Sequence, residues 1–101
     1  MKVRLTAPAR RQADRLDRWW RANRPLAIDL FARELAGTLR QIGEAPEIGP
    51  PYVERQGTVV RRVLLPRTKN HVYYEIDDDE GVVMILAVWG APKKRGPKLT
   101  P

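Results

Sequence analysis

Hydrophobic and polar residues follow two different periods along this chain. Within residues 8–43 the apolar positions recur every three or four residues, a spacing that is typical of amphipathic helices. Within residues 58–90 three apolar, β-branched segments are separated by two polar turns, which predicts an antiparallel β-meander. A short alternating segment in residues 1–7 predicts a first strand at or near a sheet edge. The pattern therefore predicts an α+β fold, in which an N-terminal strand and a helical hairpin pack on a three- to four-stranded antiparallel β-sheet.

Residues 8–43 are predicted to form two helices that are joined by a short break at Asn23-Arg24-Pro25. Because so short a connection brings the second helix back along the first, we expect an antiparallel hairpin. Trp20 lies on the apolar stripe of the first helix, whereas Trp19 beside it is expected to be partly exposed. The stripes consist of Ala9, Ala13, Leu16 and Trp20 in the first helix, and of Ile28, Phe31, Leu35, Leu39 and Ile42 in the second.

The middle strand of the predicted meander has one apolar and one polar face. Since side chains alternate along a strand, His71 and Tyr73 are expected on the same face. Residues 82–89 are apolar without a break, as expected for a strand that is covered on both sides. Residues 43–57 are rich in proline and glycine and are predicted to form an ordered loop, and residues 91–101 a basic tail.

Two adjacent arginines, Arg61 and Arg62, interrupt the first strand of the meander. They must lie on opposite faces, so one is expected to face the helices and the other the open surface. Either arginine could bind a target, or could lie beside the core and pair with an acidic side chain. Lys93, Lys94 and Arg95 are expected to leave the sheet near these two arginines and to contribute to target binding.

The composition limits the possible chemistry. The 101 residues carry a net charge of +7 and the sequence pI is about 10.4, so the chain is attracted to polyanions or acidic proteins, although a basic surface can also serve solubility alone. There is no cysteine and no serine, and His71 is the single histidine, which excludes disulfides and Ser–His or Cys–His nucleophile pairs. No cofactor and no metal is expected. With no apolar run of about 20 residues and no secretory signal, a cytoplasmic location without membrane contact is predicted.

Five short motifs follow one another over nearly the whole chain. They are LTAPARRQADRL, then Leu39 with Pro46 and Gly49, then Arg61 with Arg62, then HVYYEIDDD, and finally ILAVWG. Their order resembles that of the ParE/RelE superfamily of toxins from bacterial type II toxin–antitoxin systems, and the chain looks nearer to ParE. The resemblance implies a single ParE/RelE-like domain over residues 1–101. The chain departs from many ParE-like chains after Trp89, where the family's histidine is absent while the basic residues remain.

The superfamily contains two quite different activities. ParE-like members poison DNA gyrase, and RelE-like members cut mRNA within the ribosome; a degenerate, non-toxic binding module is a third alternative. Attack by the RNA 2′-hydroxyl needs a base, a cation and an acid. The candidates for these roles are Arg61, Lys69, His71, Tyr73 and Arg95, but the final residues KLTP lack the tyrosine or histidine that RelE-like nucleases usually carry. We therefore favour a non-enzymatic gyrase poison that inhibits growth and serves plasmid stabilisation.

The resemblance also implies a partner, a small ParD-like or similar antitoxin with a DNA-binding domain. Its C-terminal segment is expected to be acidic or amphipathic and to fold on binding. The candidate target-binding residues are Arg61, Arg62, Lys69, Trp89, Lys93, Lys94 and Arg95. The candidate antitoxin-binding residues are Leu16, Trp19, Trp20, Phe31 and Leu35.

Overall fold

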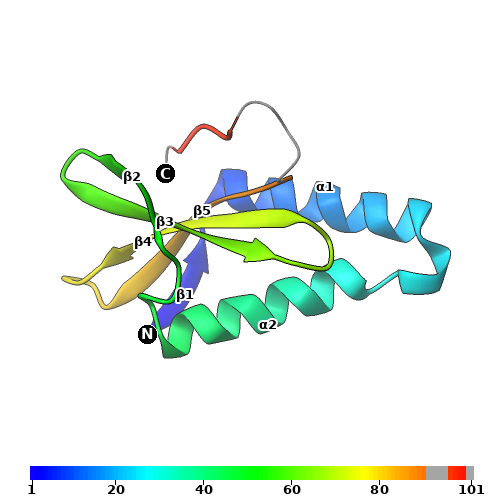
Figure 1. Cartoon of the computed structure of the whole chain (residues 1–101), viewed down its shortest axis with the longest axis horizontal. Coiled ribbons are helices and arrows are strands. Elements are labelled where there is room, and N and C mark those ends of the chain that lie inside the picture. Colours follow the sequence, from blue (N-terminus) through cyan, green and yellow to red (C-terminus); the bar gives the residue numbers. More distant parts are fainter. Residues whose placement is uncertain (91–95, 100–101) are drawn as a thin grey trace.

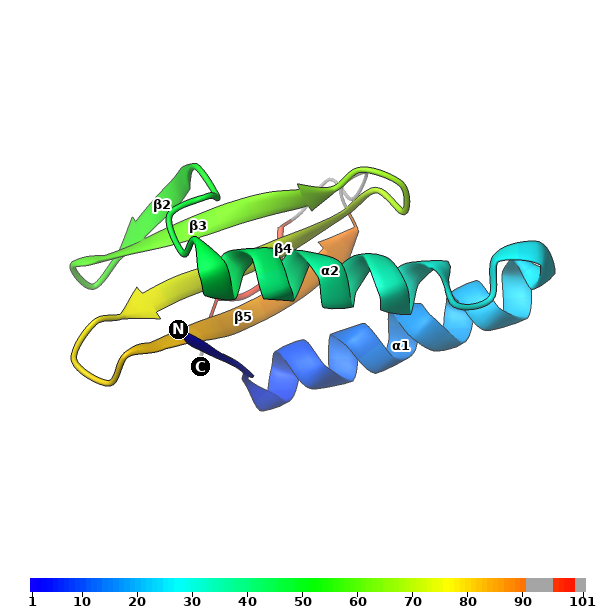
Figure 2. The same ribbon diagram turned by 90° about the horizontal axis from the view of Figure 1, so that it is seen from below.

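The structure, a computed structural model, describes residues 1–90 and 96–99 and has the predicted α+β architecture. Two helices cover one face of a five-stranded sheet, as Figures 1 and 2 show from two directions. The elements are β1 (Lys2–Leu5), α1 (Ala7–Asn23), the 3-10 turn η1 (Pro25–Ala27), α2 (Leu30–Glu44), β2 (Pro51–Arg55), β3 (Thr58–Leu65), β4 (Asn70–Asp77) and β5 (Val82–Gly90). The three strands of the predicted meander are thus confirmed, and so is the helical hairpin.

The sheet has the strand order β1-β5-β4-β3-β2. The pairs from β2 to β5 are antiparallel, whereas β1 pairs in parallel with β5. The helical hairpin connects β1 to the other strands. As predicted, β1 lies at one edge of the sheet, but its parallel pairing with β5 makes the sheet mixed rather than wholly antiparallel.

The loop that the sequence predicts over residues 43–57 is partly a strand, because β2 forms the other edge of the sheet there. Gln56 and Gly57 connect β2 to β3 as a two-residue turn, and both have a positive φ, 52° and 79°. Asn-Gly and Asp-Gly are the usual signals for such a turn, since both residues must adopt the left-handed conformation. Gln-Gly lacks this signal, and the strand before it is short and exposed, so β2 was not predicted.

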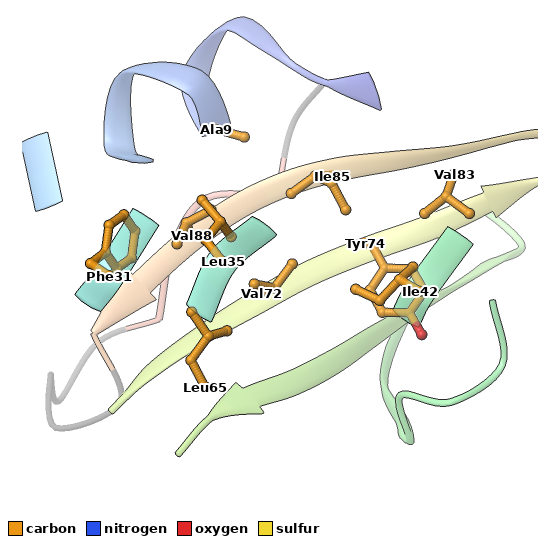
Figure 3. Packing of buried hydrophobic residues seen from close by; sticks show 10 residues of the cluster. All are labelled: Ala9, Phe31, Leu35, Ile42, Leu65, Val72, Tyr74, Val83, Ile85 and Val88. Carbon is orange, nitrogen blue, oxygen red and sulfur yellow. The ribbon is translucent and has the colours of Figure 1, made fainter. Parts of the chain in front are cut away.

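The hydrophobic core lies between the helices and the sheet (Figure 3). The Thr6 side chain caps α1 by accepting a hydrogen bond of 3.2 Å from the Ala9 N–H. The apolar stripe of α1 packs on β5. The buried cluster consists of Ala9, Phe31, Leu35, Ile42, Leu65, Val72, Tyr74, Val83, Ile85 and Val88. Both predicted stripes therefore contribute to the core, except that Ile28, expected on the second stripe, precedes α2 and is 46% exposed.

A second, smaller cluster lies on the opposite face of the sheet, which we call the far face. Val60, Tyr73, Leu86 and Ala87 are buried there, with Met84, Trp89 and Leu99 packed against them. Leu99 belongs to the predicted basic tail, of which residues 91–95 and 100–101 lie outside the described part. The far face is thus apolar at its centre and is partly covered by the chain's own C-terminal segment.

Among residues 1–90 and 96–99, no helix combines the length and the apolar character that a membrane span requires.

Candidate functional site

Arg61 lies on the helix-covered face of the sheet and holds the loop that follows α2. Its Nη1 donates to the Gly49 carbonyl at 2.8 Å and to the Glu47 carbonyl at 3.4 Å. Tyr74 on the neighbouring strand holds the same loop, because its hydroxyl donates to the Pro46 carbonyl at 2.6 Å and accepts from the Gly49 N–H at 2.9 Å. Arg61 therefore pairs with backbone carbonyls rather than with an acidic side chain, and this structural contact accounts for its position.

Arg62 lies on the far face, near the side chains of Tyr52, His71 and Tyr73. Its guanidinium group stacks on the Tyr52 ring at 4.5 Å from the ring centroid. The Tyr52 and Tyr73 rings meet edge to face at 5.2 Å, and the His71 and Tyr73 rings at 6.0 Å. The prediction that His71 and Tyr73 share a face is thus confirmed, and the arginine beside them is Arg62, not Arg61.

The far-face cluster favours the neutral forms of His71 and Tyr73. Burial lowers the pKa of His71 below its ordinary 6.5, and the positive charge of Arg62 lowers this pKa further. Burial also raises the pKa of Tyr73, against the opposing effect of its hydrogen bond to Arg62. A neutral imidazole can accept a proton and a neutral phenol can donate one, so the cluster contains a possible base, acid and cation. Within the described residues, no three His, Asp or Glu side chains are grouped as they would be to hold a metal ion.

A groove with a volume of about 780 Å³ lies between α1 and the end of the sheet where β3 turns into β4. We call it the tryptophan groove, because Trp19, Trp20 and Trp89, the three tryptophans of the chain, all line it. Its other lining residues are Gln12, Arg15, Leu16, Arg24, Arg67, Thr68, Lys69, Asn70, Val88 and Gly90. Four of these residues are cations and none is acidic.

The wall that α1 forms follows from helical spacing. Gln12, Leu16, Trp19 and Trp20 recur at intervals of three and four residues, so they share one side of the helix. The rings of Trp19 and Trp20 meet edge to face at 5.5 Å, and the Arg24 guanidinium lies 5.2 Å from the Trp19 ring centroid. Trp19 is 46% exposed, which confirms the predicted difference from the more deeply packed Trp20.

The opposite wall is the β3–β4 turn, which Glu34 of α2 fixes in place. The Glu34 carboxylate accepts hydrogen bonds from the Arg67 N–H at 2.8 Å, the Thr68 N–H at 3.0 Å and the Thr68 hydroxyl at 2.7 Å. Lys69 follows with a φ of 62°, a left-handed conformation that is costly for a residue other than glycine. The turn thereby holds Arg67 and Lys69 across the groove from the helix.

The structure divides the predicted site residues among several places. Leu16, Trp19 and Trp20, predicted for the antitoxin, and Lys69 and Trp89, predicted for the target, line the same groove. Arg62, His71 and Tyr73 lie together on the far face. Phe31 and Leu35 are 1% and 9% exposed and belong to the core, so in this structure they offer a partner almost no surface. Lys93, Lys94 and Arg95 lie outside the described residues.

The chain leaves the sheet beside Lys69 and not beside the paired arginines. Gly90 pairs with Asn70, the first residue of β4, whereas Arg62 pairs with Tyr73, three residues further along β4. At about 3.4 Å per residue the separation along the strand is about 10 Å. The end of β5 thus adjoins the β3–β4 turn and the tryptophan groove. Further along the tail, Gly96 lies beside the hydroxyl of Tyr52, the residue on whose ring Arg62 stacks. Lys93, Lys94 and Arg95, which were expected near the two arginines, lie outside the described residues.

Sequence reasoning missed several residues of these sites. Arg15, Arg24 and Arg67 line the groove, Tyr52 stacks on Arg62, and Glu34 holds the turn. Helical spacing gives a signal for Arg15, which lies one turn before Trp19. Arg24, four residues after Trp20, is also within reach of helical spacing. The others depend on contacts between separate segments, such as α2 with the β3–β4 turn, which no local pattern indicates.

The comparisons with known proteins agree with this architecture. The chain matches the family model described as the ParE toxin of the type II toxin–antitoxin system parDE over residues 3–93. The chain therefore belongs to the ParE toxin family and is a toxin of the ParE/RelE type. It is similar to the structure of the toxin–antitoxin complex RelBE2 from Mycobacterium tuberculosis, with 27% identity and a TM-score of 0.52 over 88% of this chain and 95% of that chain. The comparison with curated proteins found no match.

Proposed function

We propose that this toxin inhibits growth by binding and poisoning DNA gyrase rather than by cleaving RNA. The observation that supports this proposal is the separation of Arg61 and Lys69, two of the cations predicted for RNA cleavage, from the acid–base pair. His71 and Tyr73 lie on the far face with Arg62, while Arg61 is bound to the 46–49 loop and Lys69 lines the groove. RNA cleavage needs base, acid and cations around one phosphate, because charge accumulates there in the transition state.

The tryptophan groove is the surface that we assign to the target. Its exposed cations Arg67 and Lys69 lie in the β3–β4 turn, next to the end of β5, where Gly90 pairs with Asn70. Arginine and tryptophan are enriched among the residues that contribute most to protein interfaces. A basic, aromatic patch therefore suits a protein target better than a small substrate.

We further propose that a cognate antitoxin neutralises the toxin. The match to the family of parDE toxins and the similarity to a chain of a toxin–antitoxin complex support this partner. Since gyrase acts on the chromosome and plasmids, the proposed function places the toxin in the cytoplasm.

A gyrase assay with purified toxin tests the proposal. We expect loss of supercoiling activity with accumulation of cleaved plasmid DNA. Arg67→Glu with Lys69→Glu should abolish the effect, whereas Arg10→Glu with Arg40→Glu, which changes the net charge equally at two exposed positions outside the groove, should preserve it. Unaffected gyrase together with cleaved mRNA in a translating extract would overturn the proposal.

The far-face cluster favours one second candidate, a RelE-like ribosome-dependent ribonuclease. In that case His71 is the base, Tyr73 the acid and Arg62 the cation, and Arg61 has no part. Single substitutions His71→Gln and Arg62→Gln would each lower mRNA cleavage in a translating extract by about 100-fold or more. Cleavage that persists in both variants would exclude this cluster as the catalytic site.

A further inference from the structure

We propose that the solvent-facing side of α1 binds the phosphate backbone of duplex DNA, so that the toxin contacts both gyrase and the DNA on which gyrase acts. The choice of DNA among polyanions rests on the proposed function, whereas the surface itself follows from α1. This helix carries five arginines and two aspartates, a net charge of +3. By contrast, α2 carries two arginines and two glutamates and has no net charge.

Three of the five arginines share one side of α1. We call them the arginine stripe, which consists of Arg11, Arg15 and Arg18. At 3.6 residues per turn, their side chains leave the helix within an arc of about 60°. This arc lies opposite the side from which Leu16 and Trp20 pack against the core, and all three arginines are exposed. The stripe therefore faces solvent along about two turns of α1.

The arginine stripe has no anionic partner within the described part of the chain. The ion pairs found there join Arg21 to Asp17 at 3.0 Å and Arg33 to Asp29 at 3.2 Å. Asp14 lies beside the stripe on the same helix, but it pairs with none of the three arginines. The guanidinium groups of the stripe can therefore bind an external anion without first breaking an internal ion pair.

The spacing of the stripe matches that of phosphates along a duplex. Seven residues separate Arg11 from Arg18, which corresponds to about 10 Å along the axis of α1. Each strand of duplex DNA carries one phosphate about every 3.4 Å of its axis, so about three phosphates lie along that length. Because guanidinium groups form strong, charge-assisted hydrogen bonds to phosphate oxygens, each arginine of the stripe can contact one phosphate.

The residues around the stripe favour a duplex over a protein or a single strand. The stripe continues at its two ends into Ala7 and Ala22, so it offers no large apolar anchor of the kind on which protein interfaces depend. The aromatic residues of α1, Trp19 and Trp20, line the groove instead. Single-stranded nucleic acids bind mainly by stacking on such rings. The stripe thus suits a ligand that offers phosphates alone.

The stripe adjoins the surface that we assign to the protein target. Arg15 belongs to the stripe and also lines the tryptophan groove, as does Trp19 one turn later. A protein bound in the groove and a duplex bound along the stripe would therefore lie side by side. This arrangement suits an enzyme that acts on DNA, because one toxin molecule could hold the enzyme and its cleaved DNA together.

Fluorescence anisotropy of a labelled duplex tests the surface directly. With a duplex of about 20 base pairs at low salt, we expect a Kd in the micromolar range that differs little between DNA sequences. Arg11→Gln with Arg18→Gln should raise this Kd about tenfold or more. The double substitution should also reduce the slope of log Kd against log salt concentration by about 2, because two phosphate contacts are lost. Arg15 stays unchanged in this variant because it also lines the groove.

The matched control is Arg33→Gln with Arg40→Gln, which removes two exposed arginines that are also seven positions apart, but on α2. It should change the Kd by about threefold or less, since only the overall charge is altered. Asp14→Asn should lower the Kd, because it removes the acidic group beside the stripe. Equal weakening by the two double variants, with unchanged melting temperatures, would overturn the inference. Tighter binding of duplex RNA than of duplex DNA would also overturn it.

A gyrase assay distinguishes this inference from the proposed function. Arg11→Gln with Arg18→Gln should raise the toxin concentration needed for half-maximal cleavage of plasmid DNA about threefold or more, whereas the α2 control should not. If this variant poisons gyrase as well as the wild type does, the DNA contact fails while gyrase poisoning stands. If the wild-type toxin never affects gyrase, the proposed function fails, and the anisotropy titration still decides whether the stripe binds duplex DNA.

Discussion

Arg61 and Arg62 are neighbours in the chain, yet they lie on opposite faces of the sheet and their guanidinium groups contact different kinds of partner. Arg61, on the helix-covered face, donates to two backbone carbonyls of the loop after α2. Arg62, on the far face, stacks on Tyr52 beside His71 and Tyr73. The comparison shows that adjacent cations in a strand do not form one patch, because the pleat separates them. Arg61 on the covered face stabilises the fold, whereas Arg62 on the far face is partly exposed and the cations of the groove are exposed.

The largest expected effect tests how tightly the covered face is built around the 46–49 loop. A Cβ atom at Gly49 would lie 2.8 Å from the Tyr74 hydroxyl and 2.8 Å from Val63 Cγ2. Gly49→Ala should therefore lower the free energy of unfolding by about 2–3 kcal/mol, measured by urea denaturation. Gly37→Ala on α2, where the nearest atom is 3.8 Å away, should instead raise it by up to about 1 kcal/mol. Equal stabilities of the two variants would contradict the packing described for Gly49.

Substitution of each arginine in turn shows how much each one contributes to the free energy of unfolding. Arg61→Met removes the donor to Gly49 and should cost about 1–2 kcal/mol of unfolding free energy, because a charged hydrogen bond is lost at a partly buried carbonyl. Arg62→Met keeps the packing on Tyr52 and should cost about 0.5 kcal/mol or less. The reverse order in paired denaturation curves would show that the far-face arginine holds the fold.

Substitution of Lys69 is expected to raise stability while it weakens the proposed function of the groove. Its φ of 62° is readily adopted by glycine, so Lys69→Gly should raise the free energy of unfolding by about 1 kcal/mol. The same substitution removes a groove cation and should weaken gyrase poisoning. Lys69→Asn, which tolerates the left-handed conformation and also lacks the charge, is the matched variant. Poisoning that is fully retained in both variants would remove Lys69 from the target surface.

The smallest expected effect is a pH dependence on the far face. The pKa of His71 is lowered in the folded state, so the unfolded chain binds more protons below its ordinary 6.5. Stability should therefore be fully present above that value and fall as the pH decreases through the folded-state pKa, and His71→Gln should reduce this fall in the melting temperature. Arg62→Met should raise the His71 pKa in an NMR titration, because the neighbouring positive charge is removed. An unchanged pKa would mean that burial alone sets it.

The sequence predicted what depends on local periodicity. The two helical stripes, the meander and the opposite orientations of Arg61 and Arg62 all follow from side-chain spacing, and each is present in the structure except for Ile28, which is exposed before α2. The strand β2 was missed because Gln56-Gly57 is an uncommon pair for a turn with two positive φ values. The parallel pairing of β1 with β5 joins residues about 80 positions apart, and no short-range pattern encodes such a pairing.

The candidate sites were predicted residue by residue but not as groups. Trp19 and Lys69 were each identified, yet their meeting across one groove depends on the Glu34 contact between α2 and the β3–β4 turn. Phe31 and Leu35 were assigned to a partner because an apolar stripe has the same pattern whether it faces a core or a ligand. The three-dimensional contacts decide between those two uses.

Growth after induction of a far-face triple variant tests most directly whether this toxin acts through the groove. The variant carries Arg62→Gln, His71→Gln and Tyr73→Phe, and its melting temperature should stay near that of the wild type. We expect it to arrest growth as strongly as the wild type, whereas Arg67→Glu with Lys69→Glu should abolish the arrest. Normal growth of cells that contain the folded triple variant would contradict this account and assign the toxic activity to the far face.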